Sequence, residues 1–125
     1  MTPFGRKLRE LRQQRRLTLK EMAGELGVSA AYLSALEHGK RGVPAWYLVQ
    51  RVIAYFNVIW DEAEELERLA QISDPRVVVG TAGLSPESTE FANRLAREVA
   101  NLEPEDFREL SGLLETRLRA RRKSP

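Results

Sequence analysis

Apolar residues recur at helical spacing in two short neighbouring runs, and the rest of the chain is organised around them. The first run covers 19–26 and follows Thr18 and Glu21, whose spacing is that of a capping box. Gly27 ends this run, because glycine adopts a left-handed backbone at little cost. The second run covers 30–38. The pattern therefore predicts two short helices joined by a tight turn.

The residues around this turn are those of a helix-turn-helix. Ala23, four residues before Gly27, leaves room for the two helices to cross closely, and Val28 fills the corner. Leu33 and Leu36 form the expected buried face of the second helix. In a helix-turn-helix this second helix lies in the major groove of DNA. The alternative is a helical corner inside another kind of α domain.

Five further segments carry helical periodicity or helix-start signals. The expected helices run from Thr2 or Pro3 to Arg16, from Ala45 to about Asn57, from after Trp60 to near Ser73, from Ser85 to a break at 102–104, and from about Glu105. The expected buried face after Ala45 consists of Trp46, Val49, Val52, Ile53 and Phe56. Residues 73–84 have turn residues at both ends, which indicates a linker; a short strand at 77–79 is the alternative there.

Composition and charge exclude several classes of protein. The 125 residues include no cysteine and one histidine, so neither a disulfide, a metal site, a cofactor nor an enzyme active site is expected. No apolar run approaches the ~20 residues of a membrane span, and the start lacks a secretory signal, so we expect a cytoplasmic, nucleoid-associated protein. Residues 1–60 hold ten Lys/Arg against four Glu, whereas residues 61–125 hold ten against fourteen Asp/Glu. This asymmetry favours a polyanion-binding part followed by a part with another role.

Residues 4–72 resemble the Xre family of prokaryotic regulators, which shares the five-helix fold of the lambda-type phage repressors. The matching stretches are Phe4-Gly-Arg-Lys-Leu-Arg-Glu-Leu-Arg12, Leu17-Thr-Leu-Lys-Glu-Met-Ala23 and Ser29-x-x-Tyr32-Leu-Ser-x-Leu-Glu37-x-Gly39-Lys-Arg41. The last stretch is the most specific of the three. The resemblance implies an all-α, lambda-repressor-like helix-turn-helix domain and a transcriptional regulator that binds double-stranded DNA.

The resemblance also implies the DNA contacts. Base-reading positions are Ser29, Ala30, Ala31, Tyr32, Ser34 and Ala35. Backbone contacts are expected from Thr18, Lys20, His38, Lys40 and Arg41. The phage repressors present glutamines on this helix, whereas the two alanines here offer only contacts with thymine methyl groups. Direct reading therefore depends most on Tyr32, unless its ring instead covers the interface with the preceding helix.

Arg12 and Glu37 match a structural pair of the family, which ties the first helix to the end of the third. The forked guanidinium of arginine suits a carboxylate partner. We therefore expect removal of Arg12 to cost more stability than removal of Arg6 or Arg9. The remaining arginines on this helix either attract DNA or form a solvated basic face.

The expected organisation is a DNA-binding domain at 1–72, a linker at 73–84, a helical hairpin at 85–119 and a basic tail at 120–125. Because helix-turn-helix proteins usually read DNA as two-fold dimers, we expect the hairpin to form a homodimer. The alternative is that it packs on its own first domain. A rival interpretation has it bind a different protein, either a toxin or RNA polymerase. The tail is either solvated or adds contacts with DNA.

Overall fold

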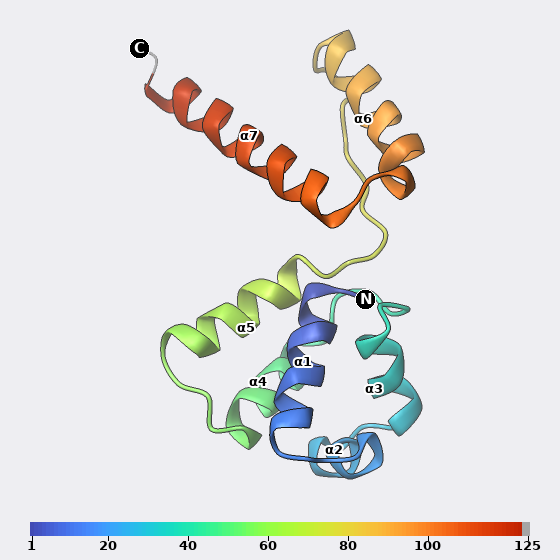
Figure 1. The fold of residues 1–125 in the computed structure, drawn as a ribbon, viewed down its shortest axis with the longest axis vertical. Helices are drawn as coiled ribbons and strands as arrows, with labels where there is room; N and C mark the ends of the chain where they lie inside the picture. The colour runs from blue at the N-terminus through green and yellow to red at the C-terminus, as the bar shows by residue number, and fades with distance from the viewer. Residues whose placement is uncertain (124–125) are drawn as a thin grey trace. The chain divides into compact units, whose positions relative to one another are not determined.

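The computed structural model describes residues 1–123, and every regular element in that range is a helix (Figure 1). The elements are α1 (Pro3–Gln14), α2 (Leu19–Leu26), α3 (Ala30–Glu37), α4 (Trp46–Tyr55), α5 (Asp61–Gln71), α6 (Pro86–Glu98), the 3-10 helix η1 (Val99–Asn101) and α7 (Pro104–Lys123). The chain divides into a first unit, Met1–Val78, and a second unit that begins at Val79. The predicted fold class, a five-helix domain followed by two helices, is confirmed.

The predicted helix ends around the central turn are present. At the start of α2, the Thr18 hydroxyl accepts a hydrogen bond from the Glu21 amide, and the Glu21 carboxylate accepts one from the Thr18 amide, both at 3.0 Å. The hydrogen bond from the Thr18 amide to the carboxylate, and the Thr18 hydroxyl beside it, lower the pKa of Glu21. At the other end, Gly27 has a φ of 71°, a left-handed backbone that glycine adopts without strain. Both ends of α2 therefore follow from local sequence.

Two helices end two residues earlier than expected. α1 ends at Gln14 instead of Arg16, and α4 ends at Tyr55 instead of Asn57. Arg16 and Asn57 have positive φ angles of 54° and 51°, which a right-handed helix does not accommodate. Hydrophobic spacing carries no information on such a change of backbone conformation. The helices predicted from it are therefore two residues too long at their C-terminal ends.

One compact core fills the first unit. Its buried apolar residues are Phe4, Leu8, Leu11, Met22, Ala23, Leu26, Leu33, Leu36, Leu48, Val49, Val52, Phe56, Val58, Leu66 and Ala70. α1 packs against both α3 and α5, while α4 packs against α2 and α5 (Figure 1). The exposed side of α3 is thereby left free of other elements of the core.

The expected buried face of α4 is wrong at its first position. Trp46 is 72% exposed, whereas Leu48, which is not part of the expected face, is fully buried. Because side chains on a helix lean toward its N-terminus, a residue in the first turn extends past the end of the helix and away from the core beneath it. Ile53 is only partly buried, whereas Val49 and Val52 are buried as expected.

α1 is held closely against the end of α3 and the end of α5. A Cβ atom at Gly5 would collide with the backbone carbonyl oxygen of Leu36. At the other contact, the buried Ser73 hydroxyl accepts a hydrogen bond from the Phe4 amide at 2.9 Å and donates one to the Leu69 carbonyl. The Phe4 amide is in the first turn of α1 and has no partner inside the helix, so Ser73 satisfies it.

Gly5→Ala is expected to lower the free energy of unfolding by about 2 kcal/mol, because crowding at a packed backbone outweighs the better helix propensity of alanine. Gly24→Ala is the matched control. Gly24 is also inside a helix, but a Cβ atom there meets nothing within 4 Å. We expect this control to raise the free energy of unfolding by about 0.5–1 kcal/mol. Urea unfolding measures both, and equal effects would contradict the close contact of α1 with α3.

The second unit leaves its apolar residues exposed. Ser85 caps α6 and Pro86 is its first residue, as expected, but no residue of α6 or α7 is buried. The α6–α7 apolar face consists of Phe91, Leu95, Val99, Phe107, Leu110, Leu113, Leu114 and Leu118, whose exposed fractions range from 37% to 66%. Figure 1 shows the two helices diverging from their short connection, so they do not cover each other.

One expectation for the end of the chain needs correction, whereas residues 73–84 contain no helix or strand, as expected of a linker. The alternative strand at 77–79 does not form within the described part of the chain. α7 continues to Lys123, so residues 120–123 are helical and do not form a separate tail; residues 124–125 lie outside the described range. Across residues 1–123, no helix has both the length and the apolar character needed to cross a bilayer.

Candidate nucleic-acid interface

α3 presents one exposed side and one buried side. Ser29, Ala30 and Ala31 at its start are exposed, while Leu33 and Leu36 are buried beneath it. The three other positions predicted to read bases, Tyr32, Ser34 and Ala35, are partly buried. The most accessible part of α3 is therefore its first turn, which is the part that contacts base edges when a recognition helix enters the major groove.

The serine and histidine side chains at the two ends of α3 form contacts within the helix. The Ser29 hydroxyl accepts a hydrogen bond from the Tyr32 amide at 3.1 Å and so caps α3. His38 is turned back toward its own helix, with its Nδ1 atom 2.8 Å from the Ser34 carbonyl oxygen and 3.4 Å from the Ser34 hydroxyl. If Nδ1–H donates to that carbonyl, Nε2 is left to accept a hydrogen bond from Arg9, which lies 3.5 Å away.

Tyr32 contacts both the core of the first unit and the loop after α3. Its ring packs against the core of the first unit and is partly buried. The guanidinium carbon of Arg41 lies 5.9 Å from the centre of the same ring, within the range of a cation–π contact. The loop that carries Arg41 is thus brought beside the start of α3.

Arg12 and Glu37 form a two-pronged ion pair beneath α3. Arg12 donates from Nε to one carboxylate oxygen at 2.9 Å and from Nη2 to the other at 3.0 Å. Its Nη1 atom also donates to the Leu17 carbonyl at 3.2 Å. The hydrogen bonds and the charge of Glu37 raise the pKa of Arg12, although burial acts in the opposite direction. The Glu37 side chain is 2% exposed, so the pair is the main compensation for a buried charge.

Arg9 is a second partner of Glu37, which we did not predict from the sequence. Its Nε atom lies 3.3 Å from Glu37 Oε1. Arg9 and Arg12 are three residues apart in one helix and therefore share a face, which is the only signal in the sequence. This contact distinguishes Arg9 from Arg6.

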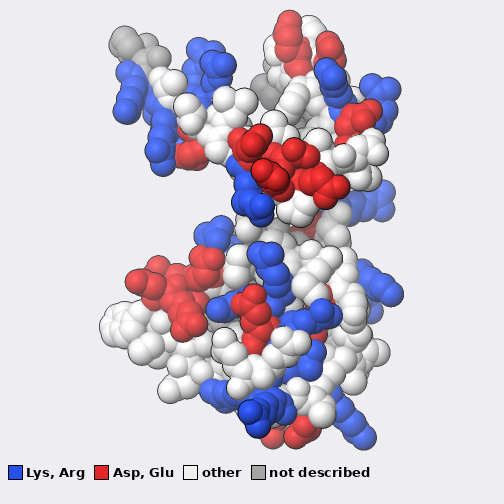
Figure 2. Space-filling view, in the orientation of Figure 1, with Lys and Arg blue, Asp and Glu red and all other residues white. Residues whose placement is uncertain are grey.

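The expected backbone-contact residues lie around α3 and are exposed. They are Thr18, Lys20, His38, Lys40 and Arg41. The Thr18 hydroxyl already serves the capping box of α2. Figure 2 shows further Lys and Arg side chains over α1 and beside the lower helices of the first unit. The first unit therefore offers cations on several sides of the exposed helix, as a phosphate backbone requires.

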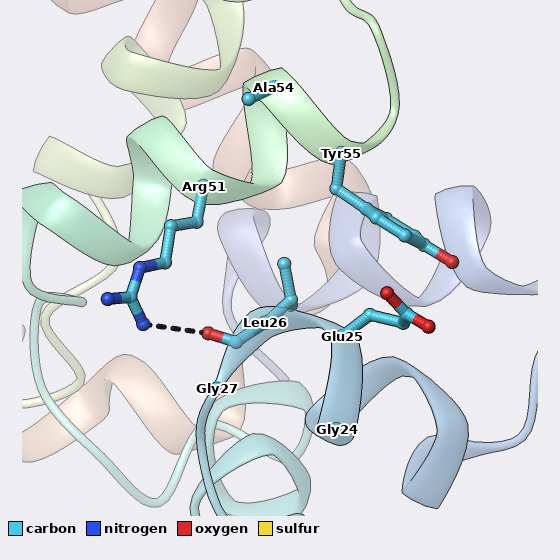
Figure 3. Close-up of a pocket in the computed structure, with 7 residues that line it drawn as sticks. All are labelled: Gly24, Glu25, Leu26, Gly27, Arg51, Ala54 and Tyr55. Atoms are coloured by element: carbon cyan, nitrogen blue, oxygen red, sulfur yellow. Dashed lines mark hydrogen bonds between the residues drawn. The ribbon is translucent and has the colours of Figure 1, made fainter.

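A shallow pocket lies between α2 and α4, beside the turn before α3 (Figure 3). Arg51 and Tyr55 project into it from α4, and Arg51 Nη1 donates a hydrogen bond to the Leu26 carbonyl at 2.9 Å. A cation at the C-terminal end of a helix is favourable for the helix dipole. A Cβ atom at Gly27 would lie 2.9 Å from the same Nη1 atom. We therefore interpret the residues that line this pocket as structural support for the turn.

Two short helices that cross at a glycine turn, with the second one exposed, define a helix-turn-helix domain. The family model described as a helix-turn-helix domain matches residues 3–74. The chain belongs to this family.

Two curated regulators of Bacillus subtilis (strain 168) are similar to the chain. It is 41% identical over 61 residues to an uncharacterized HTH-type transcriptional regulator, RghRB, and 54% identical over 44 residues to the HTH-type transcriptional repressor RghR. The alignments cover 49% and 35% of this chain and 44% and 33% of the relatives, so the chain spans less than half the length of the relatives it matches. Among solved structures, one chain of the SinR protein/SinI protein complex has a TM-score of 0.45 and 21% identity, over 91% of this chain and 96% of that one.

Proposed function

We propose that the chain is a sequence-specific transcriptional regulator that binds double-stranded DNA as a homodimer in the cytoplasm. In this proposal α3 lies in the major groove, and the bases are read from Ser29, Ala30, Ala31, Tyr32, Ser34 and Ala35. The single observation that supports it best is the helix-turn-helix family match over residues 3–74, with the first turn of α3 exposed. The names of the relatives refer to transcription and not to catalysis.

The α6–α7 apolar face supports the dimer. Monomeric soluble proteins rarely expose large contiguous apolar patches, and such patches usually mark interaction sites. A second copy would bring an identical face, which satisfies a two-fold contact. We therefore propose that residues 85–119 hold two DNA-binding units together.

Arg41→Ala tests whether the loop after α3 contacts phosphates. We expect weaker binding to a duplex selected from a random pool and to unselected DNA alike, and a salt slope smaller by about one unit. Arg68→Ala removes the same charge from an exposed position on α5, where Arg68 pairs with Glu65 at 2.7 Å, and is the control. Fluorescence anisotropy over a range of salt concentrations measures both. A loss of affinity that depends on the base pair at a single position would instead indicate that Arg41 reads a base. An affinity equal to that of the control variant would contradict the phosphate contact.

Tyr32→Ala is expected to cost about 1–3 kcal/mol of binding free energy for the selected duplex, with little change for random DNA, if the residue reads a base edge. Because Arg41 lies over its ring, Tyr32→Phe is needed to separate the hydroxyl from the ring. The phenylalanine variant keeps the packing and the cation–π contact. A lower melting temperature of Tyr32→Ala with an unchanged ratio of specific to nonspecific binding would show that the residue supports the fold.

A further inference from the structure

The loop between α4 and α5 carries an apolar projection away from α3. Ile59 is 61% exposed and Trp60 is 82% exposed, and we call these two residues the Trp60 knob. The residue before them, Val58, is 8% exposed and belongs to the core. The knob is therefore held at its base by the packed interior of the first unit. Tryptophan presented from a rigid base is typical of an interface anchor.

The fold itself does not explain a tryptophan at position 60. Trp60 has a φ of 53° and a ψ of −124°, a conformation that bulky residues rarely adopt. It also occupies the cap position of α5, where serine, threonine, aspartate or asparagine usually accepts a hydrogen bond, and its side chain makes no such bond. Glycine would relieve the backbone, and a small polar residue would cap the helix. The exposed indole of Trp60 neither relieves the backbone nor caps the helix.

Carboxylates border the Trp60 knob on one side. Asp61, Glu62 and Glu64 form the first turn of α5 and are exposed. Glu62 pairs with Lys7 at 3.7 Å, while Asp61 and Glu64 form no ion pair with the residues that the structure describes. Figure 2 shows acidic side chains gathered over α5, next to uncharged surface. The surface thus combines an apolar anchor with an acidic border.

We propose that the Trp60 knob and this acidic turn dock onto another protein that offers an apolar pocket bordered by lysine and arginine. The charge argues against the other occupants. Nucleic acids and anionic membranes are repelled by carboxylates. A two-fold contact between copies would set the acidic turns against each other. A head-to-tail contact between copies, which forms a ring or a filament, is an outcome that the test below separates. The proposal goes beyond DNA binding and is independent of it.

Photo-cross-linking in the producing cell tests the proposal with the full chain. A benzophenone amino acid replaces Ile59 in one strain and Trp46 in another, because Trp46 is comparably exposed on a different part of the same unit. The adducts are identified by mass spectrometry. The same experiment is repeated with Trp60→Gly and with Glu64→Lys. Glycine suits the positive φ, so the melting temperature of Trp60→Gly should not fall, which separates docking from folding.

The expected result is one adduct from position 59, formed with a different protein and mapped to a site bordered by lysine and arginine. Its yield should fall at least tenfold with either substitution, while binding to the selected DNA duplex stays unchanged. The proposal is overturned if position 59 yields no adduct, an adduct only with another copy of this chain, or one with a site that lacks basic residues. It is equally overturned if position 46 yields the same adduct, or if the adduct survives either substitution.

Discussion

Arg12→Ala is expected to lower the free energy of unfolding by about 3 kcal/mol, because it leaves a buried carboxylate without its main partner. Glu37 accepts hydrogen bonds from Arg12 at 2.9 and 3.0 Å, and its side chain is 2% exposed. The remaining bond from Arg9, at 3.3 Å, is a single contact from a side chain that is 33% exposed. Burial of the charge would therefore be only partly compensated.

A graded series of substitutions separates the effect of losing this ion pair from the effect of losing a positive charge. Arg6 is exposed on the same helix and forms no ion pair within residues 1–123, so Arg6→Ala should change the free energy of unfolding by less than about 0.5 kcal/mol. Arg9→Ala should lie between the two, at about 1 kcal/mol. Arg12→Lys keeps the charge but loses the fork, so it should restore only part of the stability. Urea unfolding gives the order, and equal stability of the Arg6 and Arg12 variants would contradict the role of the pair.

The same pair has a consequence for DNA binding. Glu37 is the last residue of α3, so the contact with Arg12 fixes the end of the proposed recognition helix against α1. Precise reading of base edges needs a helix held by its supporting residues. Where the Arg12 variant is still folded, we expect its affinity for the selected duplex to fall more than its affinity for random DNA.

Local signals in the sequence predicted the elements around α3 because each signal acts within a few residues. Thr18, Glu21 and Gly27 determine both ends of α2 through a capping box and a left-handed turn. The spacing of Leu33 and Leu36 likewise predicts the buried side of α3. Such features need no knowledge of the rest of the fold.

The features that the sequence did not predict depend on neighbours distant in the chain. Nothing local distinguishes Gly5 from a tolerated helical glycine, since its restriction comes from the Leu36 carbonyl on another helix. Arg9 differs from Arg6 through its contacts with Glu37 and His38, which are 28 and 29 residues away. Trp46 fits an apolar stripe by spacing, yet its place at the start of α4 leaves it exposed. Tertiary geometry decides each of these cases.

Removal of the second unit, by ending the chain after Val78, is expected to leave a folded monomer with much weaker binding to a two-site operator. The buried core of the first unit contains no residue beyond Ala70, and Ser73, which ties α1 to α5, is retained. The truncation should therefore keep the thermal stability of the first unit. It removes every residue of the α6–α7 apolar face, which we propose holds two copies together.

The loss should appear only where two half-sites are bound at once. Linking two modules typically raises affinity by about 10²–10⁴-fold, so the truncated chain should lose on the order of a hundredfold on a two-site duplex and less than about twofold on a single half-site. Leu113→Glu with Leu114→Glu, two exposed residues of α7, should reproduce this loss in the full-length chain. Sedimentation at tens of micromolar should show a dimer only for the unmodified chain. A monomeric full-length chain, or a truncated chain that keeps its two-site affinity, would contradict dimerisation through residues 85–119. A different protein bound stoichiometrically to the α6–α7 apolar face would instead support the alternative, in which this face binds another protein.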